Sequence, residues 1–440
     1  MKLSGWGRYP VCETEVQFPR TQEAVSAALR EGPAIARGNG RSYGDTALGA
    51  PNTLDMRHFN RMISFDDATG TLTAEAGVLL ADVISSFLPR GWFPAVTPGT
   101  KFVTLGGMIA ADVHGKNHHR DGSFRQFVDW IDLMDETGEV LRCSRTQNAE
   151  LFDWTLGGMG LTGVILRTAI RLRRVETGWI SQTTLPAPNL DAAIDLIESN
   201  LDALYSVAWI DCLATGSDTG RSLVMLGEHA LLAELGKDQS AHPFGTEAKR
   251  SLSVPIDFPA FSLNRYSIRA FNSLYYWNGG RKSGESLVHW NGYFYPLDAI
   301  LAWNRIYGRR GFCQFQCALP LETSAKGLKA LLTETSNAGL GSFLAVLKRF
   351  GEQSGQFSFP MPGYTLALDF PMGRYTEDLL KRLDDITIEN GGRFYLAKDA
   401  RMSAATFARS DDRVRNFKHM RRDAGLDHRF QSHQSKRLEL

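Results

Sequence analysis

The sequence predicts an α+β protein with two domains, and three observations lead to this prediction. The chain has 440 residues, and at roughly 150 residues per domain this is enough for two or three domains. From about residue 33 to residue 172, short β-like runs alternate with glycine-rich turns. After residue 175, helix-like stretches alternate with aromatic strand-like runs, which is typical of an α+β domain.

Individual elements can be placed within this frame. Residues 128–143 predict a β-hairpin, because a Glu-Thr-Gly turn separates two apolar runs. Residues 164–172 alternate apolar and arginine positions, which predicts a half-buried strand that closes the first domain. In the second domain, residues 190–205 favour a helix, whereas 289–298 and 311–320 favour aromatic strands.

Composition and charge narrow the possible partners and the compartment. With 43% hydrophobic and 22% charged residues, the chain is an ordinary folded protein. Lys+Arg 49 against Asp+Glu 48 leaves a net charge of +1, which argues against a nucleic acid partner. The segment 393–440 is the exception, since basic residues exceed acidic ones there by six. This segment leaves peripheral association with an acidic membrane surface open.

The location is predicted from the cysteines and from hydropathy. The five cysteines are odd in number and form no Cys-x-x-Cys pair, which favours a reducing compartment. No apolar run has the length of an export signal or a membrane span. We therefore expect a cytoplasmic protein, at most peripheral at the inner face of the cell membrane.

The first of three glycine clusters lies in residues 36–48. Its spacing is close to Gly-x-Gly-x-x-Gly, but a dinucleotide-binding Rossmann fold needs a helix directly after this turn. Gly49 and Pro51 interrupt any such helix. The remaining interpretation is a loop of free backbone N–H groups, interleaved with Arg37 and Arg41, that forms a nest for a diphosphate. A plain turn between two strands is the alternative.

The second cluster covers residues 96–124. Residues 104–107 precede a small-residue stretch that predicts a helix start, where backbone amides can bind an anion. Three histidines in 114–119, together with Asp112, raise the possibility of a metal site. Gly115 and Asn117 would break the helix that such a site needs, so we predict no metal; a surface loop with hydrogen-bonded histidines is the larger alternative.

The third cluster, residues 155–166, places four glycines just before the strand that ends the first domain. Three glycine-rich loops in one domain, none of them in a Rossmann context, indicate one extended nucleotide cofactor that lies across several loops.

These motifs resemble a known family. The strings are ARGNGRSYGD, TPGT, LGGMIAADVHGKNHH and LGGMGLTGVI, followed by NGYFYPLD, AWNRIYG, QFQ, VLKRFG, LDFP and GGRFYLAKDAR. Together they resemble the vanillyl-alcohol-oxidase or PCMH-type FAD-binding flavoproteins, and most closely those members that oxidise a polyprenylphosphoryl ribose. The resemblance runs in order through nearly the whole chain.

The resemblance implies a domain arrangement. Residues 1–175 would form the FAD-binding domain, and 393–440 would complete it. Residues 176–392 would form an α+β substrate domain built on an antiparallel sheet.

The resemblance also implies the cofactor and the residues around it. Some relatives attach FAD through a histidine in the first loop, but this chain has Arg41, Ser42 and Tyr43 there, so we expect noncovalent FAD. The expected FAD-binding residues are Ala36, Arg37, Gly38, Asn39, Gly40, Arg41, Ser42, Tyr43, Gly44, Asp45, Thr46, Gly99, Thr104, Leu105, Gly106, Gly107, His114, Gly115, Lys116, Val164 and Tyr395.

Two residues are expected to be catalytic. Oxidation of a secondary alcohol by flavin needs a hydride acceptor and a group that takes the hydroxyl proton. A lysine near the flavin serves as the base if its pKa falls and as a cation if it does not. Lys398, by its match to the family, is the first candidate, although a simple ion pair with Asp399 is the alternative. His114 would orient the hydroxyl or relay its proton.

The expected substrate contacts are amides, cations and aromatic rings. Strand alternation places Gln314 and Gln316 on one face, where amides suit sugar hydroxyls, unless that face meets solvent. Thr365 and Ala367 differ from the Asn and Cys of mycobacterial members, so no thiol is expected there. The complete expected set is Tyr43, Tyr295, Gln314, Gln316, Lys348, Thr365 and Lys398.

The activity implied by the resemblance is oxidation of the 2′-hydroxyl of a polyprenylphosphoryl-β-D-ribose to the 2′-ketone, with hydride transfer to flavin N5. This would be the first half of an epimerisation to arabinose, which a separate NADH-dependent short-chain reductase would complete. An oxidase of free alditols or aldonolactones is the alternative enzyme. A flavin-binding electron-transfer subunit without its own substrate is the alternative from another class.

Overall fold

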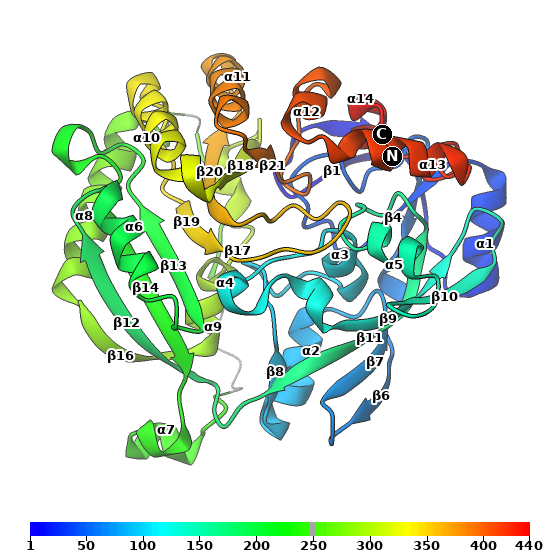
Figure 1. The fold of residues 1–440 in the computed structure, drawn as a ribbon, viewed down its shortest axis with the longest axis horizontal. Helices are drawn as coiled ribbons and strands as arrows, with labels where there is room; N and C mark the ends of the chain where they lie inside the picture. Colours follow the sequence, from blue (N-terminus) through cyan, green and yellow to red (C-terminus); the bar gives the residue numbers. More distant parts are fainter. Residues whose placement is uncertain (246–251, 260) are drawn as a thin grey trace.

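The computed structural model describes residues 1–245, 252–259 and 261–440, and two groups of sheets divide it (Figure 1). One group contains a six-stranded antiparallel sheet in the order β10-β9-β11-β7-β6, with β8 paired to β11. A small parallel sheet, β3-β5-β4, belongs to the same group. The other group is an eight-stranded antiparallel sheet in the order β16-β12-β14-β13-β19-β20-β18-β21. The predicted α+β fold with an antiparallel second sheet is confirmed.

The bounds of the elements are as follows. The strands are β1 (Lys2–Ser4), β2 (Val11–Glu13), β3 (Glu15–Gln17), β4 (Ala34–Arg37), β5 (Asn52–Asp55), β6 (Met62–Asp66), β7 (Thr71–Glu75), β8 (Trp92–Pro94), β9 (Val128–Met134), β10 (Val140–Ser144), β11 (Val164–Arg174), β12 (Trp179–Ala187), β13 (Tyr205–Ile210), β14 (Ser222–His229), β15 (Leu252–Ser253), β16 (Gly284–His289), β17 (Ile300–Leu301), β18 (Phe312–Pro320), β19 (Ala345–Phe350), β20 (Gly363–Pro371) and β21 (Arg393–Phe394). The α-helices are α1 (Gln22–Glu31), α2 (Leu80–Phe87), α3 (Leu105–Ala110), α4 (His118–Asp121), α5 (Ala149–Thr155), α6 (Leu190–Glu198), α7 (Lys237–Ala241), α8 (Arg265–Arg281), α9 (Trp290–Phe294), α10 (Leu321–Ala338), α11 (Arg374–Glu389), α12 (Ala404–Ser410), α13 (Arg413–Asp423) and α14 (His433–Leu438).

The predicted strand at residues 164–172 is confirmed as β11, but it is buried on both faces. Val164 and Leu166 belong to one apolar core, and Ile165 and Ile170 to another. The reason is its position, because β11 lies in the middle of its sheet between β9 and β7, with α3 and β4 packed against it. The hairpin predicted for 128–143 is confirmed as β9 and β10.

The prediction of a strand at residues 289–298 is wrong, because this segment forms α9 followed by a 3-10 turn. Trp290, Tyr293 and Phe294 recur at i, i+3 and i+4, and all three are buried on one helical face. His289 caps the helix by accepting a hydrogen bond from the backbone N–H of Asn291 at 3.2 Å. The strand predicted in 311–320 is confirmed as β18, and the helix predicted within 190–205 is confirmed as α6.

A long loop joins the two sheet groups. The connection between β19 and β20, residues 351–362, leaves the eight-stranded sheet and crosses to α3 (Figure 1). Gln353 donates from its amide to Asp112 Oδ2 at 3.2 Å, and Arg125 donates to the carbonyl of Ser354 at 2.5 Å. These contacts fix the position of the substrate-side sheet relative to the glycine-rich loops.

The C-terminal helices complete the first sheet group, and one arginine holds them there (Figure 1). Arg437 in α14 bridges two carboxylates, Asp45 at 2.7 Å and Asp399 at 2.8 Å. Asp45 lies in the first glycine-rich loop, and Asp399 follows Lys398 directly. The ion pairs therefore join the start and the end of the chain.

Replacement of Arg437 by Met should lower the free energy of unfolding by about 3 kcal/mol, because two buried carboxylates lose their cation. Urea unfolding followed by circular dichroism measures this loss. Arg409→Met is the matched control, since Arg409 and its partner Asp385 are both exposed, and it should cost less than about 1 kcal/mol. Equal losses of unfolding free energy in the two variants would contradict the stabilising role of the Arg437 ion pairs.

Candidate active site

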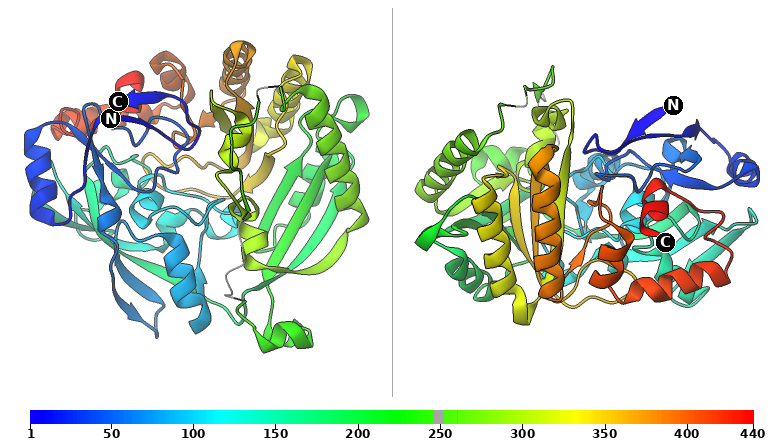
Figure 2. Two further views of the ribbon diagram at one scale, coloured as in Figure 1. Left: turned by 180° about the vertical axis from the view of Figure 1, so that it is seen from behind. Right: turned by 90° about the horizontal axis from the view of Figure 1, so that it is seen from above.

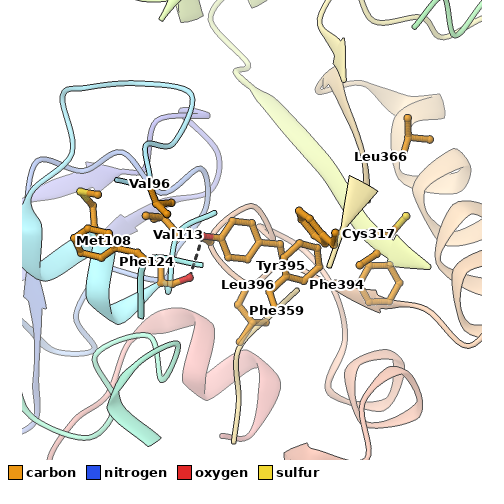
Figure 3. Packing of buried hydrophobic residues seen from close by; sticks show 14 of the residues in the cluster. Val96, Met108, Val113, Phe124, Cys317, Phe359, Leu366, Phe394, Tyr395 and Leu396 are labelled. Atoms are coloured by element: carbon orange, nitrogen blue, oxygen red, sulfur yellow. Dashed lines mark hydrogen bonds between the residues drawn. The ribbon is translucent and has the colours of Figure 1, made fainter. Parts of the chain in front are cut away.

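A cavity of about 390 Å³ lies between the glycine-rich loops and the eight-stranded sheet. Tyr395 stands at the junction, where its hydroxyl donates to the carbonyl of Ala111 at 3.0 Å (Figure 3). Figure 3 shows its ring beside Phe359, with Met108 and Phe124 on one side and Phe394 and Cys317 on the other. A cavity of this size with polar groups along an apolar wall is typical of a small-molecule site.

Most of the predicted site residues meet in this cavity. Those that line it are Ala36, Arg37, Gly38, Asn39, Gly40, Arg41, Ser42, Tyr43, Thr46, Gly99, Thr104, Gly106, Gly107, His114, Lys116, Gln314, Gln316, Lys348, Thr365, Tyr395 and Lys398.

Six predicted residues do not line the cavity: Gly44, Asp45, Leu105, Gly115, Val164 and Tyr295. Leu105 and Val164 are core residues with no exposed surface. Tyr295 is also completely buried. Its ring packs against Trp290 and against Phe294, and Phe294 rather than Tyr295 lines the cavity.

The loop after β4 contains no helix, as the sequence predicts, and its backbone is free to bind an anion. The backbone N–H groups of residues 39–42 donate no hydrogen bond to any part of the chain that the structure describes. Gly40 adopts a positive φ of +62°, which turns the chain at this point. Arg41 places its guanidinium 4.1 Å from the centre of the Trp6 ring, and its buried Nε has no partner. Free amides and an unpaired cation fit the diphosphate of FAD.

Arg37 stabilises the loop itself, because its side chain binds backbone carbonyls of the protein. Its guanidinium donates to the carbonyls of Ser4 and Ala47 at 2.9 and 3.2 Å. The side chain of Arg37 therefore holds the loop in shape, and Arg37 is also one of the residues that line the cavity.

The start of α3 is not the anion site that the sequence predicts. The N–H groups of Leu105 and Gly106 donate to the carbonyls of Val78 and Ala76, and that of Gly107 donates to Thr104 Oγ1. The first amides of the helix are therefore already satisfied by the protein. Gly106 and Gly107 still line the cavity, where the missing side chains leave room for a flat ring.

His114 is buried on the cavity wall and is neutral. Its ring packs against Phe350 at 4.8 Å and Tyr395 at 5.1 Å between ring centres. Burial, with the nearby charge of Lys348 as the second cause, lowers the pKa of His114 well below its usual value. The amide of Gln316 donates to Nε2 at 3.1 Å, so the proton of the ring is on Nδ1, which has no partner.

Two partly buried lysines line the cavity, Lys348 and Lys398. Burial lowers the pKa of Lys348 to about 8. Burial also lowers the pKa of Lys398 to about 7, against the opposing effect of the Asp369 carboxylate. The Nζ atom of Lys398 lies 3.8 Å from the centre of the Tyr43 ring. Neither lysine forms an ion pair with any residue that the structure describes.

The alternative role for Lys398, an ion pair with Asp399, does not occur in this structure. Asp399 accepts from Arg437 and from the backbone N–H groups of Arg401 and Met402. Burial alone would raise the pKa of Asp399, but these groups hold this pKa below its usual value. Lys398 is therefore left without this neighbour as a counter-ion.

Asp369 is the functional candidate that the sequence did not reveal. The amide of Gln314 donates to Asp369 Oδ1 at 2.5 Å, and the hydroxyl of Tyr307 donates to Oδ2 at 3.4 Å. Burial raises the pKa of this carboxyl above its usual value. The register of β18 and β20 brings Gln314 and Asp369 together. In the sequence, Asp369 appeared only as part of the motif LDFP, with no role assigned to it.

A row of side chains crosses the sheet under the cavity. Strand pairing aligns Gln316 on β18 with Ala367 on β20, Val346 on β19 and Trp209 on β13. All four line the cavity. The two glutamines are buried, so the interpretation of a solvent-facing strand does not hold.

The histidine cluster is dispersed among different partners. His118 bonds to Gln353 at 2.8 Å, and His119 bonds to the carbonyl of Ala203 at 2.8 Å. Asp112 accepts from Ser123 and from the backbone of Arg125. Within 1–245, 252–259 and 261–440, no group of three or more His, Cys, Asp or Glu is arranged to hold a metal ion.

Comparisons with known proteins agree with this geometry. Residues 15–144 match the family described as FAD binding domain. The whole chain is 35% identical to a decaprenylphosphoryl-beta-D-ribose oxidase of Mycolicibacterium smegmatis, over 97% of that protein. It is 31% identical, over 80% of its length, to an uncharacterized protein in the mprA 5′ region of Streptomyces coelicolor, and 30% identical over 46% to the L-gulonolactone oxidase of Bos taurus.

The fold and the site define an FAD-dependent oxidoreductase. Because the strongest of these similarities covers both proteins almost completely, the chain belongs to the decaprenylphosphoryl-β-D-ribose oxidase family.

Gly40→Ala should weaken FAD binding at least tenfold, because a Cβ there would collide with the Arg37 guanidinium and displace the free amides. Gly425→Ala is a matched control, since Gly425 has a φ of +67° and open space around it. The two variants share the backbone strain, but only the first should lose flavin. Equilibrium titration of apoprotein with FAD measures the difference, and equal affinities would contradict the assignment of the loop.

Proposed function

We propose that this protein oxidises the 2′-hydroxyl of a polyprenylphosphoryl-β-D-ribose to the 2′-ketone. The observation that carries the proposal is the set of groups that line the cavity: the amide of Gln316, neutral His114 and the unpaired lysines Lys348 and Lys398. Amides recognise sugar hydroxyls, and a buried cation without a counter-ion suits a phosphate. The family relationship supports the same substrate class, because the relative is named for it.

The order of groups along the sheet follows the order of groups in such a substrate. Gln316 on β18 offers an amide, Lys348 on β19 offers a cation, and Trp209 on β13 offers an apolar surface. A sugar, a phosphate and a prenyl chain follow one another in the same sequence. A free polyol has no group that needs the apolar end.

FAD, when bound, supplies the hydride acceptor. Lys398 takes the proton of the substrate hydroxyl at Nζ, because its lowered pKa leaves much of the amine neutral near pH 7. The amide nitrogen of Gln316 binds His114 and Thr365, so its Oε1 atom is left to accept a hydrogen bond from the sugar, and His114 holds this amide in place. Asp369 sits behind Gln314, fixes its amide, and moderates the fall in the pKa of Lys398.

The cofactor is held without a covalent bond. The first loop has Arg41, Ser42 and Tyr43 at the positions where covalent relatives have a histidine, and the free amides of residues 39–42 bind the diphosphate instead. Residues 1–175 and 393–440 form the FAD-binding part, and 176–392 form the substrate part.

The ketone passes to a separate NADH-dependent short-chain reductase, which completes the epimerisation to the arabinose form. The protein works in the cytoplasm, at the inner face of the membrane that contains its lipid substrate. In the described residues, no helix is long and apolar enough to cross a membrane. We propose that its contact with the membrane is peripheral.

An oxidase of free alditols or aldonolactones is the second candidate. The similarity to L-gulonolactone oxidase favours it, but this similarity covers only 46% of the chain. The two candidates differ in whether a phosphate and a prenyl chain are required.

Anaerobic reduction of the bound flavin by a short-chain polyprenylphosphoryl ribose distinguishes them. Rapid bleaching of the flavin absorbance is expected with this compound, and at least a hundredfold slower bleaching with free alditols. Lys348→Met should raise the Kd for the phosphorylated compound by about tenfold or more, because one charge-assisted contact is lost. Faster reduction by an alditol would overturn the proposal.

The role of Lys398 predicts a pH profile. The rate constant of flavin reduction should rise as the pH increases through about 7, because the neutral amine is the base. Lys398→Ala should keep FAD yet lose at least a hundredfold in this rate.

Lys398→Arg separates a base from a cation, because arginine stays charged over the whole range. It should be as slow as the alanine variant and show no rise with pH. A rate that falls above pH 7 in the wild type, together with an active arginine variant, would assign Lys398 as a charge stabiliser instead.

A further inference from the structure

The helix α8 presents apolar side chains to solvent. Tyr266, Leu274 and Trp277 are 75%, 63% and 56% exposed, whereas Ile268 and Asn272 face inward and are buried. The three exposed residues, with Ala270, recur at i, i+4, i+8 and i+11, which places them in one stripe along the helix. A surface helix normally turns such a stripe toward the core.

The surroundings of this stripe are basic. Residues 261–283 contain four basic residues, Arg265, Arg269, Arg281 and Lys282, and no acidic residue, in a chain with a net charge of only +1. All four are exposed. None of them forms an ion pair with the residues in the described ranges. An apolar stripe flanked by unpaired cations is typical of a helix that lies in a membrane interface.

The helix also adjoins the cavity. Tyr275 of α8 lines the cavity, and its ring lies 4.7 Å from that of Trp209, the apolar end of the row across the sheet. On the other side, Tyr275 stacks on Phe271 at 5.8 Å, and Phe271 is 44% exposed. An unbroken aromatic surface therefore runs from the cavity to the exposed side of α8.

We propose that the stripe of α8, defined by Tyr266, Ala270, Leu274 and Trp277, docks on an anionic lipid bilayer. The aromatic and leucine side chains enter the boundary between headgroups and acyl chains, and the four basic residues meet the anionic headgroups. A lipid-linked substrate can then slide from the bilayer over Phe271 and Tyr275 into the cavity. This last step rests on the proposed function, whereas the docking itself does not.

The structure favours α8 over the basic C-terminal segment as the membrane contact. The two lie at opposite ends of the molecule (Figures 1 and 2). In the C-terminal segment, Arg401, Arg413 and Arg437 are bound to aspartates of the protein itself. Other cations of that segment, among them Arg415, Lys418 and Arg422, form no ion pair with the described residues. The segment 393–440 exposes no large apolar side chain, however, so it lacks the apolar stripe that α8 has.

Cosedimentation of the FAD-loaded protein with vesicles tests the docking. Phosphatidylcholine vesicles that contain phosphatidylglycerol should bind the wild type, and pure phosphatidylcholine vesicles should bind it much more weakly. Leu274→Ser/Trp277→Ser should bind the anionic vesicles at least tenfold more weakly. Val11→Ser/Ile63→Ser removes two comparably exposed apolar residues outside α8 and should bind like the wild type.

The outcomes are separable from those for the proposed activity. The vesicles contain no substrate, and flavin reduction by a water-soluble short-chain substrate should be equal in the wild type and the α8 variant. Equal vesicle binding by the α8 variant, or no binding by the wild type, would overturn the docking. A wild-type dimer that the same variant converts to a monomer, without vesicle binding, would assign the stripe to a second copy of the chain and also overturn it.

Discussion

The bridge from Arg437 to Asp45 and Asp399 is the interaction on which the site depends. Asp45 belongs to the loop whose free amides fit a diphosphate, and Asp399 is the residue after Lys398. A backbone hydrogen bond joins the same two segments, because the N–H of Tyr43 donates to the carbonyl of Ala397 at 2.9 Å. One partly buried cation from the last helix therefore ties the first glycine-rich loop to the segment that carries Lys398.

The same bridge shapes the electrostatics of the cavity. Because Arg437 neutralises Asp399, that carboxylate does not raise the pKa of Lys398, and burial lowers it. Asp369 is the remaining carboxylate that acts on this lysine, and burial raises its own pKa. A protein that needs a lysine base near neutral pH has to keep strong counter-ions away from it, and this arrangement does so.

The sequence correctly predicted those features of the fold and the site that are determined by residues close together in the chain. The absence of a helix after residue 48, the alternation that pairs Gln314 with Gln316, and β18 itself follow from turn chemistry and from period-two spacing. The family resemblance supplied Lys398 and His114, which no local pattern would identify.

What the sequence missed depends on contacts between distant segments. Asp369 meets Gln314 only through the register of two strands, 55 residues apart along the chain. The amides at the start of α3 are consumed by carbonyls of residues 76 and 78, which no motif reveals. The segment 289–298 contains so many aromatic residues that its composition favours a strand, yet the helical spacing of its buried rings decides its structure.

The net charge of the sequence also fails to predict a property of the folded protein, namely where charge lies on its surface. A balance of 49 basic and 48 acidic residues says nothing of where charges lie. The formal charge of the C-terminal segment suggests a membrane contact, but Arg401, Arg413 and Arg437 are paired with aspartates there, and the segment exposes no large apolar side chain. The stretch around α8 has a smaller excess of charge, but its four cations are unpaired and lie beside exposed aromatic side chains. Peripheral binding to a bilayer needs apolar side chains that enter the interface as well as uncompensated charge, so the exposed apolar stripe of α8 outweighs the larger formal charge of the tail.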